Sequence, residues 1–99
     1  MDFPKINIPQ DKIAQFCQKN NIATLSLFGS VLTEKFNPSS DVDFLVEFEP
    51  EHIPTLFDVV DMEEELSSII GCHADLRTAK GISRYFRDEV ISTAKKIYG

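Results

Sequence analysis

Two short segments decide the fold: LFGS at residues 27–30 and DVDFLV at residues 41–46, with ten residues between them. The first closes an alternating apolar stretch over residues 24–28, which predicts a strand that ends at the glycine and serine. The second opens another apolar stretch, over residues 41–48, which predicts a second strand. These two predicted strands form the start of the predicted sheet.

The two aspartates of the second segment, Asp41 and Asp43, are expected to lie on one face of the strand. Residues i and i+2 of a strand point to the same side, with Cα atoms about 6.6 Å apart. Val42 and Phe44 then point the other way, into the core. Two carboxylates this close repel each other, and a hard cation such as Mg²⁺ would remove the conflict. The alternative is a surface turn with charges at a strand edge.

The glycine and serine that end the first strand, Gly29 and Ser30, are candidates for holding an anion. A turn between a strand and a helix leaves backbone N–H groups free to bind phosphate. Glycine lets the phosphate approach the backbone, and the Ser30 hydroxyl adds a donor. With aspartates opposite, this arrangement would hold a nucleoside triphosphate through Mg²⁺.

A third aspartate, Asp75, lies on a short predicted strand over residues 73–77. It can add a carboxylate beside the first two, and three carboxylates fit two-metal phosphoryl chemistry. Asp75 can also accept the proton of an incoming hydroxyl, which is most needed for tyrosine because its pKa is about 10.

The remaining chain alternates helices with these strands. The expected helices are one from about Pro9 to residues 20–21 with Ile13, Phe16 and Cys17 buried, and others over 31–36, 56–70 and 83–95, the last with Phe86, Val90, Ala94 and Ile97 on one side. Gly71 is a plausible stop for the third of these helices. The pattern predicts a single α/β (α+β) domain over residues 1–99, with a small mixed sheet of three or four strands and helices packed on it.

The net charge and the lengths of the apolar runs limit the kinds of partner that the protein is expected to bind. The 99 residues carry 10 Lys+Arg and 16 Asp+Glu, a net charge of −6, so no direct binding of nucleic acid is expected. The basic residues gather after position 75, next to an acidic body. No apolar run reaches the length that crosses a bilayer, and residues 1–5 lack the features of a secretion signal, so we expect a cytoplasmic protein.

The cysteines and histidines are assigned no chemistry. Cys17 and Cys72 are far apart and have no CxxC partner, so both are expected to be small buried apolar side chains. His52 and His73 have no metal-ligand spacing and are expected to be plain polar residues.

The sequence resembles the minimal nucleotidyltransferase (MNT) proteins of the DNA polymerase beta superfamily, most closely the antitoxins paired with HEPN-domain toxins. The resemblance rests on FGS at 28–30, SDVDFLVEF at 40–48, EEEL at 63–66 and ADL at 74–76. It implies a polymerase beta-like nucleotidyltransferase fold. It also implies that Gly29 and Ser30 hold the triphosphate of ATP, while Asp41, Asp43 and Asp75 bind Mg²⁺. The implied activity is transfer of AMP from ATP to a tyrosine of the HEPN partner, which silences the RNase activity of that partner.

Two functions remain open at this point. The first is this catalytic antitoxin, which the three aspartates favour. The second is a non-catalytic antitoxin that neutralises a HEPN partner by direct complex formation. Related proteins often carry arginines directly after the Gly-Ser pair, whereas here VLTEK follows and the first basic residue is Lys35. This departure favours the binding module, unless bases such as Arg77 or Arg84 supply the phosphate contacts.

Overall fold

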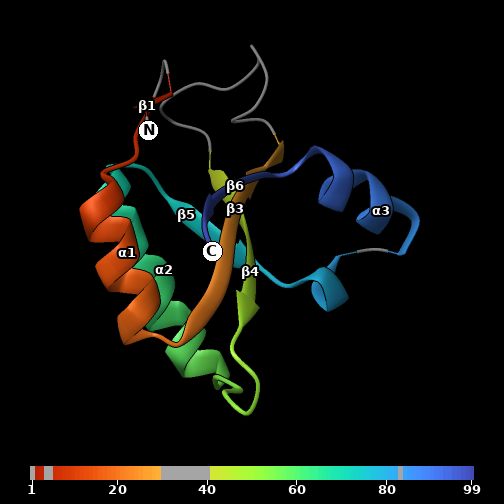
Figure 1. The fold of residues 1–99 in the computed structure, drawn as a ribbon, viewed down its shortest axis with the longest axis horizontal. Helices are drawn as coiled ribbons and strands as arrows, with labels where there is room; N and C mark the ends of the chain where they lie inside the picture. Colours follow the sequence, from red (N-terminus) through yellow and green to blue (C-terminus); the bar gives the residue numbers. More distant parts are fainter. Residues whose placement is uncertain (1, 4–5, 30–40, 83) are drawn as a thin grey trace.

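A four-stranded mixed sheet forms the centre of the fold (Figure 1). The computed structural model describes residues 2–3, 6–29, 41–82 and 84–99. Its elements are β1 (Asp2–Phe3), β2 (Ile6–Asn7), α1 (Gln10–Lys19), β3 (Ile22–Phe28), β4 (Val42–Phe48), α2 (Leu56–Ile70), β5 (Ala74–Arg77), the 3-10 helix η2 (Ala79–Gly81), α3 (Arg84–Thr93) and β6 (Lys95–Tyr98). Among these residues, no helix is long and apolar enough to cross a membrane.

The strand order is β5-β4-β3-β6. β3 pairs antiparallel with β4 and with β6, and β4 pairs parallel with β5 through the crossover helix α2. The sheet is therefore mixed and has four strands, which confirms the predicted fold class. β4, which carries Asp43 and directly follows Asp41, lies in the interior of the sheet with a neighbour on either side.

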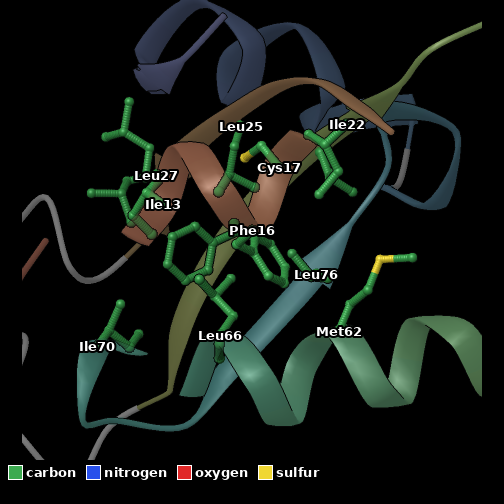
Figure 2. Packing of buried hydrophobic residues seen from close by; sticks show 14 of the residues in the cluster. Ile13, Phe16, Cys17, Ile22, Leu25, Leu27, Met62, Leu66, Ile70 and Leu76 are labelled. Atoms are coloured by element: carbon green, nitrogen blue, oxygen red, sulfur yellow. The ribbon is translucent and has the colours of Figure 1, made fainter. Parts of the chain in front are cut away.

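The hydrophobic core lies between one face of the sheet and the helices α1 and α2 (Figures 1 and 2). Phe16 of α1 and Leu66 of α2 meet there with side chains of the sheet such as Leu25, and all three are at most 1% exposed. Along β4, Val42, Phe44 and Val46 are buried while the residues between them are not. This alternation sends Asp43 to the opposite face, as the sequence predicts.

Helix α2 begins and ends where the sequence places it, at residues 56 and 70. The Thr55 hydroxyl accepts from the Asp58 N–H at 3.1 Å and the Asp58 carboxylate accepts from the Thr55 N–H at 2.9 Å, which forms a capping box. At the other end Gly71 adopts φ +79°, the left-handed conformation that closes many helices.

The last part of the chain differs from the prediction. The helix α3 ends at Thr93, and residues 95–98 form β6, where Ile97 is 6% exposed and belongs to the core. The predicted helix over 83–95 with Ile97 on its face is therefore wrong at its end, because pairing with β3 outweighs the local helical pattern. None of the described residues of α3 is buried, and Phe86 is 60% exposed.

Two smaller expectations, on the cysteines and on one helix, have different outcomes, and one strand pair was not predicted. Cys17 is buried, which raises its pKa to about 12, whereas Cys72 is only half-buried. The pairing of β1 with β2 has no counterpart in the sequence analysis. The helix expected over residues 31–36 lies outside the described residues, so that prediction stays a prediction.

Candidate metal and nucleotide site

The candidate site is built on the parallel pair β4 and β5. Their register places Asp43 opposite Asp75, and Val42 opposite Ala74. Val42 and Ala74 are fully buried on the helix side, so the two aspartates share the other face. Neighbouring strands lie about 4.8 Å apart, and this ladder of backbone hydrogen bonds therefore fixes the spacing of the two carboxyl-bearing residues.

Just before these strands begin, Asp41 and His73 form a second pair. The His73 Nδ1 lies 3.1 Å from an Asp41 carboxylate oxygen, and both side chains are more than half exposed. One ligand atom from each of Asp41, His73 and Asp75 lies within 4.8 Å of the other two. The expectation that His73 is a plain polar residue misses this placement. Its position two residues before Asp75 was the available signal, because it puts both on one strand face.

Asp43 experiences the strongest electrostatic conflict of the site. Partial burial, followed by the charge of Asp75, raises the pKa of the Asp43 carboxyl, and Asp41 adds to this. Arg77 opposes the shift but does not cancel it. Like charges and desolvation both disfavour the ionised carboxylate, and a nearby cation would relieve both.

Gly29 lies against Asp43 at the end of β3. Phe28 is the cross-strand neighbour of Asp43, and Gly29 follows with φ +81°. A Cβ at position 29 would lie 2.7 Å from the Asp43 Oδ2. Glycine is therefore required here both by the backbone conformation and by the carboxylate that approaches it. Ser30, the other predicted nucleotide-binding residue, lies outside the described residues.

Helix α2 holds the free edge of β5. The Ala74 N–H donates to the Ser67 hydroxyl and the Leu76 N–H donates to the Glu63 carboxylate, each at 2.8 Å. These two N–H groups flank Asp75 and face away from β4. The sequence does not predict this role of Glu63, because an acidic residue in the run EEE at 63–65 gives no signal for a hydrogen bond to a neighbouring strand.

The donor set suits a divalent cation. Carboxylate oxygens are the ligands that Mg²⁺, Ca²⁺ and Mn²⁺ prefer, and imidazole is accepted by transition metals. Among the described residues, Asp41, His73 and Asp75 are the group whose ligand atoms could share an ion, whereas Asp43 lies beside Asp75 on the same sheet face and is not part of that group. The pairing of β4 with β5 therefore brings two of the predicted aspartates, Asp41 and Asp75, close enough for a candidate metal site.

Two named proteins are similar to this chain in sequence. A protein of Methanocaldococcus jannaschii is 30% identical over 89 residues, which are 90% of this chain and 94% of that protein, and its name proposes a protein adenylyltransferase. Protein adenylyltransferase MntA of Thermococcus cleftensis is 34% identical over 59 residues, 60% of this chain and 58% of its own length.

Solved structures share the fold. One is a toxin–antitoxin complex with AMP-PNP, matched with a TM-score of 0.73 and 20% identity over 93% of this chain and 74% of that chain. Another is tri-AMPylated Shewanella oneidensis HEPN toxin in complex with MNT antitoxin, with a TM-score of 0.65 and 21% identity over 91% and 69%. Residues 11–99 match the family model described as polymerase beta, nucleotidyltransferase. With a relative 30% identical across nearly its whole length, the chain belongs to the polymerase beta nucleotidyltransferase family.

Proposed function

We propose that this chain is a cytoplasmic, Mg²⁺-dependent protein adenylyltransferase in a single minimal domain. It transfers AMP from ATP to a tyrosine of a HEPN-domain RNase toxin and so acts as the antitoxin. The observation that carries the proposal is the register of β4 and β5, which sets Asp43 beside Asp75 on one face. Asp41 lies directly before β4, two residues ahead of Asp43, and the raised pKa of Asp43 gives a physical reason for a bound cation.

Each predicted site residue has a role in this reaction. Asp41, Asp43 and Asp75 would hold Mg²⁺, which when bound neutralises triphosphate charge and orients the phosphates. The tyrosine oxygen forms a bond to the α-phosphorus of ATP, the bond from that phosphorus to the bridging oxygen breaks, and pyrophosphate leaves. Asp75 accepts the phenolic proton. Gly29 leaves room for phosphate at the backbone, and the Ser30 hydroxyl would donate to it.

Support for a protein acceptor comes from the exposed apolar side chains of α3. Tyr85, Phe86 and Ile91 are 86%, 60% and 51% exposed, although the helix has an apolar and a polar side. Exposed groups of large apolar side chains are typical of protein-binding surfaces. The names of the T. cleftensis relative and of the Shewanella complex point to the same substrate class.

The direct test uses the chain together with a co-expressed HEPN-domain protein. The mixture is incubated with Mg²⁺ and ATP labelled at either the α- or the γ-phosphate, and the proteins are separated on a gel. We expect the HEPN protein to carry the α label and not the γ label. Asp43→Asn should reduce the rate of labelling about a hundredfold or more. A loss of this size is typical when a group that acts on the transferring phosphate is removed.

The control is Asp61→Asn, which changes an exposed carboxylate on α2 away from the site and should leave the labelling unchanged. Label at the γ position would indicate phosphorylation instead. A HEPN RNase that is inhibited but never labelled would favour the non-catalytic antitoxin, for which the acidic charge of the chain is the supporting feature.

A further inference from the structure

The site contains a fourth polar residue that the three-aspartate pattern does not use. The β4–β5 register pairs Val42 with Ala74 and Asp43 with Asp75, so one step back it brings Asp41 beside His73. The Val42 N–H donates to the His73 carbonyl at 2.8 Å, which ties the backbone of residue 73 to β4. Asp41, Asp43, His73 and Asp75 therefore form a two-by-two arrangement on one face.

The side-chain atoms already have a separation that suits a shared cation. Octahedral sites with metal–ligand distances of about 2.0–2.1 Å place neighbouring ligand atoms about 3 Å apart and opposite ones about 4.2 Å apart. The His73 Nδ1 and the Asp41 Oδ1 are 3.1 Å apart. All three ligand atoms of Asp41, His73 and Asp75 lie within 4.8 Å of one another. Small rotations of the exposed Asp41 and His73 side chains toward the half-buried Asp75 would bring the three ligand atoms onto one ion.

We propose that His73 is a metal ligand together with Asp41 and Asp75, and that the site consequently prefers Mn²⁺ to Mg²⁺. This inference rests on the metal site of the proposed function and adds a ligand to it. Mg²⁺ favours oxygen ligands and rarely accepts imidazole, whereas first-row transition metals bind nitrogen well. The side chain of His73 is 62% exposed, so its ring can turn to an ion without leaving a packed position.

The test measures metal binding alone, without ATP or partner. Free Mn²⁺ is followed by electron paramagnetic resonance during titration, and Mg²⁺ affinity is obtained by competition. His73→Gln replaces the ring with an amide whose oxygen suits Mg²⁺. We expect this variant to bind Mn²⁺ about tenfold more weakly or worse, the range seen when a residue that supports a metal site is lost. Mg²⁺ affinity should change less than about threefold, because an oxygen ligand remains.

The matched control is His52→Gln, because the chain has two histidines and His52 lies in the exposed loop after β4. It should leave both affinities unchanged. In Co²⁺-loaded protein, a strongly shifted imidazole N–H signal in the proton NMR spectrum should persist in His52→Gln and vanish in His73→Gln. The shifted signal reports direct ligation, which a merely structural role of His73 would not produce.

Two results would overturn the inference: a His73→Gln variant that binds Mn²⁺ as well as the original chain, or one that loses Mn²⁺ and Mg²⁺ affinity equally. Neither result touches the proposed function, because AMP transfer with Mg²⁺ is measured separately. Conversely, Mn²⁺ binding through His73 in a chain that labels no HEPN protein would remove the proposed function and leave the metal ligand in place.

Discussion

Asp43 shows how one side chain can be costly for the fold and useful for the site. It is partly buried beside Asp75 and Asp41, and Arg77 offsets only part of their repulsion. The folded chain therefore holds the Asp43 proton more tightly than the unfolded chain does. Stability thus falls as pH rises from the unfolded pKa of an aspartate, about 3.9, through the higher pKa of the folded state.

The variant Asp43→Asn should consequently melt at a higher temperature than the original chain at pH 7 in the absence of divalent cations. Below about pH 3.9 both states of the original chain are protonated at this residue, so the gain should disappear. Thermal unfolding followed by circular dichroism at several pH values measures the difference. For comparison, Asp61→Asn should stay within about 0.5 kcal/mol of the original chain throughout. A gain that grows toward acid pH would contradict this explanation.

Alanine substitutions at Gly29 and Gly71 separate the effect of backbone strain from the effect of a contact with the Asp43 carboxylate. Both have positive φ, +81° and +79°, but a Cβ at Gly71 meets nothing within 4 Å, whereas one at Gly29 meets the Asp43 carboxylate at 2.7 Å. Each glycine-to-alanine change should cost about 1–2 kcal/mol through the left-handed backbone. Only Gly29→Ala should also weaken Mg²⁺ binding, because the flexible Asp43 side chain has to move. Urea unfolding and metal titration of the two variants provide the measurements.

At the scale of the elements, α2 does more than cover the core. Its Glu63 carboxylate and Ser67 hydroxyl accept the outward N–H groups of β5, and the Ser67 hydroxyl also donates to the Glu63 carbonyl at 2.6 Å. An edge strand of four residues would otherwise present unpaired donors, partly away from water. The helix therefore fixes β5 laterally, and with it the position of Asp75.

Removing the Glu63 carboxylate should lower the free energy of unfolding by about the contribution of the lost hydrogen bond. Glu63→Leu leaves the Leu76 N–H without its acceptor and should reduce the free energy of unfolding by about 1–3 kcal/mol. Glu63→Gln keeps an amide oxygen for this N–H and should cost less than about 1 kcal/mol. Chemical denaturation of both variants tests this prediction. Equal losses in both variants would show that the charge of Glu63, rather than its acceptor oxygen, is what stabilises the fold.

The exposed ion pair between Lys19 and Glu65 should add little to the free energy of unfolding.

At the scale of the whole molecule, stability is concentrated on one side of the sheet. Phe16 is 1% exposed between α1 and the sheet, whereas Phe86 on α3 is 60% exposed. Phe16→Ala should cost about 3–5 kcal/mol. Phe86→Ala should change stability by about 0.5 kcal/mol or less. If Phe86 belongs to the partner-binding surface, Phe86→Ala should still weaken AMP transfer to the HEPN protein, and the labelling assay measures this.

Much of this architecture could be predicted because local and tertiary signals agree. The end of α2 was predicted from Gly71, and the face of Asp43 was predicted from the alternation along the strand that became β4. The prediction was wrong for residues 95–98, where a long-range partner strand decides the conformation. It also missed His73 and Glu63, because their roles depend on which strands lie side by side. Ser30 stays a prediction.

The register of the parallel pair β4 and β5 also determines which side chains of β5 face the candidate site. Side chains alternate between the two faces along a strand. Deleting one residue from the short turn between α2 and β5 would therefore shift the register of β5 against β4 by one residue. Asp75 would then point into the helix layer, and Ala74 or Leu76 would take its place on the solvent side. The length of that turn therefore determines the candidate metal site as much as the acids themselves do, although no atom of Gly71 or Cys72 belongs to the cluster of possible ligand atoms.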